Sequence, residues 1–206
     1  RLNINGCLTY PGEFIPALER AEDISFLDHQ VVNKAIKLVA ANPVLHRVAI
    51  NLSAQAVSDE RLLPLIKERL KEHKVDGNRI IFELTESASL TNVSGTRRMI
   101  EQLSAIGCQF SIDDFGTGFS TFAYLKELPA DSVKIDGSFV RDMHCNDADK
   151  TLVRAIANVA LALGKQSVAE FVETEEIFDD LVGMGVRYAQ GYYIGKPVAV
   201  DALSHF

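Results

Sequence analysis

Short apolar segments and helical segments alternate along most of the chain, and this alternation limits the fold more than any other feature of the sequence. Residues 62–73 and 151–163 have apolar residues at helical spacing, and the segments between such helices are short and apolar. Alternation of this kind predicts βα units and a parallel sheet with both faces covered. Six strands are expected, at residues 47–51, 79–84, 109–113, 132–136, 167–172 and 188–194.

The composition predicts one α/β domain over residues 1–206. Apolar residues make up 47% and charged residues 24% of the chain, which is typical of a globular protein, and no Pro/Gly-rich linker interrupts it. No apolar run reaches the roughly 20 residues of a membrane span, and no signal peptide precedes the first segment. The chain does not begin with Met, and Arg1-Leu2-Asn3-Ile4 is typical of the middle of a strand. We therefore expect a fragment of a longer, multidomain protein.

Charge and cysteine content exclude some functions and favour others. The formal net charge of −7 argues against binding of long nucleic acids, which requires a basic surface, but it allows a small anionic ligand held through metal ions. Cys7, Cys108 and Cys145 lie far apart and have no metal-binding or redox spacing, which favours a reducing, cytoplasmic compartment. The histidines show no ligand spacing either, so any metal is expected to have oxygen ligands.

Polar residues at the ends of the predicted strands help to choose between two architectures. A doubly wound sheet and a (β/α)8-type barrel both fit the alternation. In a barrel the carboxyl ends of all strands converge on one mouth, whereas in an open sheet they spread along an edge. Six polar strand ends favour convergence, because buried charges without partners are destabilising. These strand ends are Asn51, Glu83, Asp113 with Asp114, Lys134, Glu170 and Gln190.

The pair Asp113-Asp114 stands where an apolar strand runs into a loop with two glycines, Gly116 and Gly118. Adjacent strand residues point to opposite faces, so the two carboxylates act together only if the chain leaves the strand there. The glycines allow such a turn. A simple strand-to-helix turn with an Asp cap explains this stretch equally well when it is taken alone.

Taken with the other strand ends, the pair indicates a metal site. Asn51, Glu83, Asp113 and Asp114 offer only oxygen ligands, which suit Mg²⁺ or Mn²⁺ rather than zinc or copper. A bridging carboxylate with further ligands on each side is the usual way to hold two such ions for displacement at phosphorus. Lys134 is then placed to orient a water or offset charge, and Glu170 to serve as a ligand or general base.

The motifs resemble those of the EAL-domain family, in order and spacing, over essentially the whole chain. Each motif alone has low specificity, but together they are specific. They are Asn51-Leu52-Ser53, Glu83-Leu84-Thr85-Glu86, Asp113-Asp114-Phe115-Gly116-Thr117-Gly118, Lys134-Ile135-Asp136, Ala169-Glu170-Phe171-Val172-Glu173 and Gln190-Gly191-Tyr192.

The resemblance implies a modified TIM (β/α)8-type barrel whose first strand is antiparallel and lies largely upstream of Arg1. It implies hydrolysis of cyclic di-GMP to linear pGpG with two Mg²⁺ or Mn²⁺ ions. By matching position, Asn51, Glu83 and Asp113 are expected to bind the first ion. Asp113 is expected to bridge to the second ion, which Asp114 also binds.

The same resemblance implies further roles. Lys134 is expected to contact the catalytic water, Glu170 to be a metal-site residue or the base, and Glu173 and Gln190 to be supporting or substrate-side groups. Arg1 is expected to contact a phosphate, Asp136 a guanine, and Glu86 to anchor the loop after Asp114.

The sequence departs from the family pattern in two places. The Glu-Ala-Leu signature is absent, and its glutamate is expected about four residues before Arg1 on the family's motif spacing. Phe171 stands where the family usually has glycine. The resemblance also implies a homodimer and an upstream sensory or GGDEF domain, in the cytoplasm or on the cytosolic side of a membrane-anchored protein. An alternative to the phosphodiesterase is a receptor module that binds cyclic di-GMP without cutting it.

Overall fold

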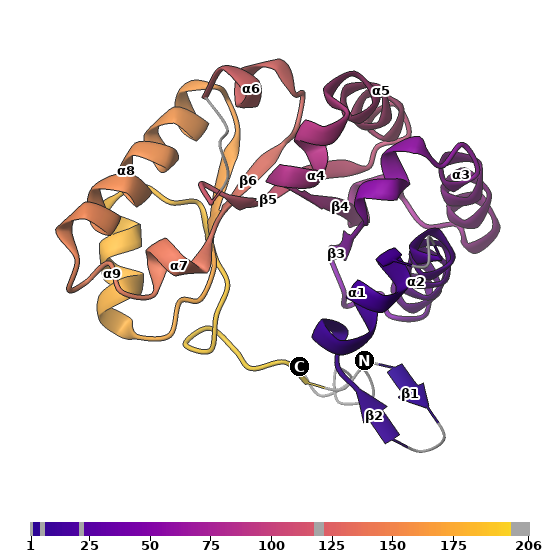
Figure 1. The fold of residues 1–206 in the computed structure, drawn as a ribbon, viewed down its shortest axis with the longest axis horizontal. Coiled ribbons are helices and arrows are strands. Elements are labelled where there is room, and N and C mark those ends of the chain that lie inside the picture. The colour runs from indigo at the N-terminus through magenta and orange to yellow at the C-terminus, as the bar shows by residue number, and fades with distance from the viewer. Residues whose placement is uncertain (1, 5–6, 21–22, 118–121, 199–206) are drawn as a thin grey trace. The chain divides into compact units, whose positions relative to one another are not determined.

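The computed structural model describes residues 2–4, 7–20, 23–117 and 122–198 (Figure 1). The chain forms two compact units, each of which is considered separately. The first unit comprises Arg1–Leu84 and Thr91–Phe110, and the second comprises Thr85–Leu90 and Ser111–Phe206. Among the described residues, no helix has both the length and the apolar character that a membrane crossing needs. The expectation of one domain over residues 1–206 stays a prediction.

The first unit contains an antiparallel hairpin, a pair of parallel strands and the helices around them. Strands β1 and β2 form the hairpin, and β3 pairs with β4 in parallel, with Asn51 opposite Glu83. The elements are β1 (Leu2–Ile4), β2 (Cys7–Thr9), α1 (Pro11–Arg20), α2 (Ile24–Ala41), β3 (Val48–Asn51), the 3-10 helix η1 (Ala54–Ser58), α3 (Leu62–His73), the 3-10 helix η2 (Gly77–Arg79), β4 (Ile80–Thr85) and α5 (Val93–Ser104).

Helix α2 is buried along one stripe and lies beside α3 (Figure 1). Its buried apolar residues Ile24, Val32 and Ile36 recur at the spacing of a helix face, and α3 contributes Ile66 and Leu70 in the same way. The burial of these side chains is the main force that holds the helices on the strands. One member of the buried α2 stripe, Asp28, is not apolar.

Arg79 joins the end of α2 to the start of β4. Its Nη2 atom donates hydrogen bonds to the carbonyl oxygens of Val39 at 3.0 Å, Asn42 at 3.0 Å and Leu45 at 2.7 Å. Carbonyls at a helix C-terminus have no partners within the helix, so a guanidinium can satisfy them. The bond therefore fixes where β4 begins relative to the helix that precedes β3.

The second unit contains parallel strands in the order β5-β6-β7-β8, which is also their order along the chain. Strand β5 begins in the first unit, with Gln109 and Phe110, and continues into the second. The elements are α4 (Glu86–Thr91), β5 (Gln109–Phe115), α6 (Phe122–Glu127), β6 (Ser132–Ile135), α7 (Gly137–Val140), α8 (Asp147–Ala162), β7 (Gln166–Ala169), α9 (Glu175–Gly183) and β8 (Tyr188–Ala189).

Helix α8 covers β6 and β7 with Val153, Ile156 and Ala160 (Figure 1). The helix ends at Ala162, and Gly164, two residues later, has a φ of +71° as a glycine after a helix allows. The next residue, Lys165, is buried, and its Nζ donates to the carbonyl oxygens of Leu128 at 2.7 Å and Ala130 at 2.9 Å. Burial lowers the pKa of Lys165. This ammonium group therefore ties the start of β7 to the loop before β6.

The six predicted strands all occur, and the predicted α/β fold with parallel strands is confirmed. The helix predicted for residues 62–73 agrees with α3, whereas the helix predicted for residues 151–163 corresponds to α8, which begins four residues earlier, at Asp147. The sequence patterns did not predict β2, η1, α4 or α7, which are too short to show a hydrophobic period.

Three predicted strands are wrong in length by two residues or more. Strand β5 continues to Phe115 rather than ending at residue 113, because the bulge at Asp113 and Asp114 keeps the end of the strand paired with β6. Strand β7 ends at Ala169 rather than 172, because Phe171 has a left-handed backbone with a φ of +52°. Strand β8 ends at Ala189 rather than 194, because the chain turns after Gly191, where the N–H of Ile194 donates to the Gly191 carbonyl at 3.1 Å. The ends of β7 and β8 both come from backbone turns that hydrophobicity does not encode.

Candidate metal centre

Asp113 and Asp114 lie on a β-bulge near the end of β5. Between Ile112 and Phe115 this strand advances three residues while the neighbouring β6 advances two, from Val133 to Ile135. Asp114 has a φ of +54°, a left-handed conformation that Asp tolerates better than most residues. A bulge re-aims side chains that would otherwise point to opposite faces. The chain therefore leaves the regular strand at the pair of carboxylates.

Lys134 links the ends of three strands through its ammonium group. Its Nζ lies 2.9 Å from Asp113 Oδ1 on β5 and 2.8 Å from Glu170 Oε1, which follows β7. Lys134 and Asp113 are 4% and 8% exposed, so these ion pairs are largely shielded from water. Shielded pairs of this kind hold their geometry, because breaking either one leaves a buried charge without a partner.

Three carboxylates gather around this ammonium group. One oxygen from each of Asp113, Asp114 and Glu170 can be chosen so that all lie within 4.8 Å of one another. Burial, followed by the charge of Asp113, raises the pKa of Asp114. Burial also raises the pKa of Glu170, although its hydrogen bond with Lys134 opposes the rise. The cluster carries more negative charge than one lysine offsets, and its oxygen donors are those that Mg²⁺ and Mn²⁺ prefer.

Glu86 holds the loop that follows the bulge. This residue begins α4, is 1% exposed, and accepts a hydrogen bond through Oε2 from the Gly116 N–H at 2.8 Å. Ser89, one turn further along α4, donates its hydroxyl to the Glu86 carbonyl at 2.8 Å and also bonds the hydroxyl of Tyr124 from α6. The contact joins α4 to the loop after β5, and the role of Glu86 as a loop anchor stays a prediction. Gly118, the second glycine of the motif, lies outside the described residues.

Asn51 and Glu83 lie side by side in the first unit. They are opposite each other at the carboxyl ends of β3 and β4, and the N–H of Leu52 donates to the Glu83 carbonyl at 2.8 Å. The Glu83 side chain is buried, whereas Asn51 is exposed. The structure thus brings together Asn51 with Glu83 in one unit, and Asp113, Asp114 and Glu170 with Lys134 in the other.

Asp28 holds the loop after β3, a contact that was not expected from the sequence. It projects from α2, is 5% exposed, and accepts from Ser53 twice, through Oδ1 from the N–H at 3.1 Å and through Oδ2 from the hydroxyl at 2.5 Å. Burial raises the pKa of Asp28, and the bonds from Ser53 oppose this rise. Ser53 is two residues beyond Asn51, so Asp28 fixes the loop that follows Asn51 at the end of β3. An acid within the buried stripe between Ile24 and Val32 was the available sequence signal.

The remaining predicted residues have other surroundings. Asp136 caps α7, accepting from the Ser138 N–H at 2.8 Å, and remains partly exposed. Gln190 follows β8, where its N–H donates to the Ala169 carbonyl at 2.8 Å while its side chain is exposed. Glu173 is exposed beyond the end of β7. Arg1 lies outside the described residues. The roles expected of these four residues stay predictions.

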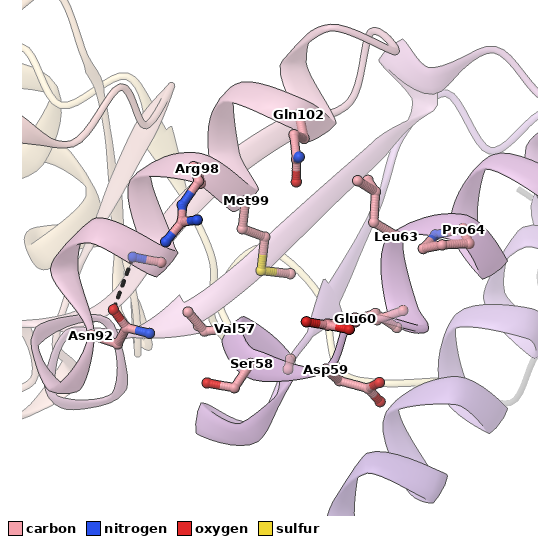
Figure 2. Close-up of a pocket in the computed structure, with 13 residues that line it drawn as sticks. Val57, Ser58, Asp59, Glu60, Leu63, Pro64, Asn92, Arg98, Met99 and Gln102 are labelled. Atoms are coloured by element: carbon pink, nitrogen blue, oxygen red, sulfur yellow. Dashed lines mark hydrogen bonds between the residues drawn. The ribbon is translucent and has the colours of Figure 1, made fainter.

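A cavity of about 450 Å³ occurs elsewhere in the first unit, between η1, α3 and α5 (Figure 2). Its wall includes Leu63, Met99, Arg98 and Gln102, together with Asn92, which accepts from the Gly95 N–H at 2.9 Å. None of the predicted site residues lines it. The lining of this cavity does not gather charges of one sign, so the cavity does not fit the predicted binding of metal ions by carboxylates. The cluster of Asp113, Asp114 and Glu170 therefore remains the candidate site.

Comparison with known proteins identifies the family and the fold. The sequence matches the EAL domain family over residues 2–197. The chain belongs to the EAL domain family. EAL relatives with curated names include the cyclic di-GMP phosphodiesterases PdeB of Shewanella oneidensis and PdeF of Escherichia coli. Each is 38% identical to this chain, over 93% and 94% of its length. Those alignments cover 23% and 26% of the relatives, so the chain spans about a quarter of their length.

Solved EAL structures superpose on nearly the whole chain. The phosphodiesterase of PaMucR in complex with c-di-GMP has a TM-score of 0.89 at 32% identity, with 97% of this chain and 82% of that chain covered. The FimX EAL domain from Pseudomonas aeruginosa bound to c-di-GMP has a TM-score of 0.91 at 28% identity, with 98% and 83% covered. The fold is therefore that of EAL domains, a TIM-barrel-like α/β fold, as predicted.

Proposed function

We propose that this EAL domain hydrolyses cyclic di-GMP to linear pGpG with the help of two Mg²⁺ or Mn²⁺ ions. The observation that carries the proposal is the cluster of Asp113, Asp114 and Glu170 around Lys134 at the ends of parallel strands. The names of the curated relatives, PdeB and PdeF, support the choice of substrate.

The oxygen donors of the cluster fit the proposed metal ions. Asp113, Asp114 and Glu170 would hold them, and the ligand roles expected of Asn51 and Glu83 stay predictions. When bound, divalent ions lower the pKa of a coordinated water and offset the charge that builds up at phosphorus. The raised pKa values of Asp114 and Glu170 arise in part from the crowding of negative charge that such cations would relieve.

Lys134 and Glu170 have proton-handling roles in this proposal. The Lys134 ammonium fixes the carboxylates of Asp113 and Glu170 and offers a donor to an attacking water or to a phosphate oxygen. Glu170, whose pKa is raised by burial, is suited to accept a proton as a general base. Glu173 is proposed to support this site from the end of β7.

The reaction breaks one of the two phosphodiester linkages of the cyclic dinucleotide. The water oxygen bonds to phosphorus, the bond from phosphorus to the 3′ oxygen breaks, and that oxygen leaves as a hydroxyl group after receiving a proton. The product keeps its phosphate at the 5′ end, as linear pGpG. Arg1 is proposed to bind a phosphate, Asp136 a guanine, and Gln190 the substrate side of the site.

A receptor that binds cyclic di-GMP without cutting it is the second candidate. The superposition on an EAL structure named as bound to c-di-GMP, and Phe171 in a position where the family usually has glycine, favour this reading. Both candidates share the ligand and differ in turnover.

Incubation of the purified protein with cyclic di-GMP and Mg²⁺ or Mn²⁺, followed by chromatography of the nucleotides, tests the proposal. We expect linear pGpG from the wild type, none from Asp113→Asn, and wild-type amounts from Asp179→Asn, a matched change at an exposed residue of α9. Saturable binding of cyclic di-GMP without product at either metal would assign the receptor function instead.

We also propose further domains, a compartment and an oligomeric state for the full-length protein. A curated relative that is 33% identical, MucR of Pseudomonas aeruginosa, is named a bifunctional diguanylate cyclase and phosphodiesterase. We expect the full-length protein to carry an upstream sensory or GGDEF domain, to act in the cytoplasm and to form homodimers. Sedimentation of the full-length protein tests the last expectation.

A further inference from the structure

Phe171 has a backbone conformation that is unfavourable for a large side chain. Its φ is +52°, and among the described residues other than glycine only Lys74 and Asp114 share a positive φ. Lys74 terminates α3, and Asp114 lies on the bulge of the metal centre. Left-handed conformations at bulky residues are rare and tend to occur where the surrounding structure imposes them for function.

The left-handed residue is the point at which the chain after β7 changes its hydrogen-bond partner. The N–H of Glu170 donates to the Ile135 carbonyl at the end of β6, at 3.3 Å. Two residues later, the N–H of Val172 donates to the Gln190 carbonyl beyond β8, at 3.1 Å. In a regular strand both N–H groups would point to the same neighbour. The turn at Phe171 therefore sets the position from which Glu170 reaches Lys134.

The Phe171 ring packs against the first turn of α7. A methyl group added at Gly137 would lie 2.0 Å from the ring carbon Cδ2, which shows that the ring occupies the space a side chain would need there. The guanidinium carbon of Arg141, four residues further along, lies 4.7 Å from the ring centroid. The ring therefore packs against the backbone at Gly137 and makes a cation–π contact with Arg141.

Helix α7 begins directly after Lys134, Ile135 and the capping residue Asp136. The ring of Phe171 therefore connects the segment that carries Glu170 to the segment that carries Lys134. Burial alone does not explain this phenylalanine, because the side chain remains 45% exposed and glycine would adopt the same φ without strain.

We propose that Phe171 is a positioning residue that packs α7 against the end of β7 and so keeps Glu170 in register with Lys134. The partners are Gly137, which leaves room for the ring, and Arg141, which covers it. For turnover the proposal rests on the phosphodiesterase function proposed above. The packing of α7 and the binding of metal do not depend on turnover.

The test compares Phe171→Gly, Phe171→Ala and Phe171→Tyr with the wild type. Three quantities are measured: amide hydrogen exchange at Ser138–Val140, the Mn²⁺ concentration for half-saturation by calorimetry, and the urea midpoint of unfolding. Phe26→Ala is the control, since Phe26 is exposed on α2 of the first unit.

Loss of the ring is expected to raise both the exchange rate of α7 and the half-saturating Mn²⁺ concentration about tenfold in the Gly and Ala variants. The Tyr variant and the control should stay within twofold of the wild type. The urea midpoint should be higher for Phe171→Gly than for Phe171→Ala, because only glycine relieves the left-handed strain. If Phe171→Ala does not fold, Phe171→Gly decides the question.

A double-mutant cycle tests the contact itself. Gly137→Ala should increase α7 exchange about tenfold when Phe171 is present, because the new methyl group displaces the ring, and by less than twofold in Phe171→Gly. Exchange and Mn²⁺ binding that stay within twofold of the wild type in both Phe171→Gly and Phe171→Ala would overturn the proposal. Absence of turnover in the wild type would instead count against the proposed function.

Discussion

Two loops that follow strands of the candidate site are each held by a buried carboxylate, one in each compact unit. Asp28 accepts two hydrogen bonds from Ser53 in the loop after β3, where the backbone is extended with a φ of −76°. Glu86 accepts one from Gly116 in the loop after β5. Its Oε1 is buried and accepts no hydrogen bond from any residue that the structure describes. Among the described residues, both oxygens of the first anchor have hydrogen-bond partners, whereas only one oxygen of the second has one.

The two loops differ in the conformational strain that they carry. The end of β5 and the loop after it have positive φ values at Asp114 and Gly116, and a left-handed residue other than glycine costs about 1 to 2 kcal/mol. A buried acceptor without a partner costs about 1 to 3 kcal/mol more. The loop after β3 has neither feature. We therefore infer that the loop after β3 is fixed, and that the loop after β5 can change conformation at a lower free-energy cost.

The largest expected effect is that of Glu86→Ala. The loop after β5 loses its anchor at Gly116, so turnover of cyclic di-GMP is expected to fall about 10- to 100-fold, as is typical when a residue that orients metal ligands is removed. Steady-state kinetics measure the change. Glu86→Gln keeps an acceptor for Gly116 and should lose less than about tenfold. Equal turnover in the wild type and Glu86→Ala would show that this loop needs no anchor.

Next in size is the effect of Asp28→Ala on stability. The substitution leaves the N–H and hydroxyl of Ser53 without their partner, so the free energy of unfolding should fall by about 2 kcal/mol, measured by urea denaturation. Asp28→Asn should lose less than about 1 kcal/mol, because an amide can accept from the N–H and donate to the hydroxyl. If the two variants are equally stable, the paired anchor is not what stabilises this loop.

Substitution by glycine is expected to change stability by a smaller amount, and with opposite sign at Asp114 and at Ser53. Asp114→Gly removes strain at a φ of +54° and repulsion from Asp113, so the metal-free protein should become about 0.5 to 1 kcal/mol more stable. Ser53→Gly, at a φ of −76°, should become about 1 kcal/mol less stable. Thermal unfolding in the presence of EDTA measures both. Destabilisation by Asp114→Gly would contradict the contrast between the loops.

The smallest effect is a pH dependence of the Asp28 anchor. Burial raises the pKa of Asp28 above its ordinary value of 3.8, so between these two pKa values the folded state binds more protons than the unfolded state. The stability that Asp28 contributes therefore increases as pH falls from 7 through its folded-state pKa, and decreases as pH rises. The unfolding free energy of the wild type, relative to that of Asp28→Asn, should therefore be greater at pH 5 than at pH 7. A shift in the other direction would mean that Ser53 outweighs burial.

Sequence patterns predicted the six parallel strands because each is a short, largely apolar run with a polar residue at or near its end. Ile80, Phe82 and Leu84 of β4, and Val133 and Ile135 of β6, are almost fully buried. Helices of at least two turns were also predictable from their apolar period. The short helices α4 and α7 were not, because they are set by caps such as Asp136 and by contacts with distant residues.

The carboxylates of the site could be named from the sequence, but their support could not. Asp113 and Lys134 stand at predicted strand ends, whereas the contact of Asp28 with Ser53 spans 25 residues and follows from how α2 packs on β3. The left-handed conformation of Phe171 was equally hidden, since local preference argues against it. Tertiary packing overrides local preference at both places.

The central claim is that Asp113 and its neighbours form a metal centre, and calorimetric titration of Mn²⁺ into the protein tests it most directly. We expect saturable binding by the wild type and at least about tenfold weaker binding by Asp113→Asn. The far-UV circular dichroism and the urea midpoint of the control variant, Asp179→Asn, should be the same as those of the wild type. Equal Mn²⁺ affinity in the wild type and Asp113→Asn, with both proteins folded, would contradict the account.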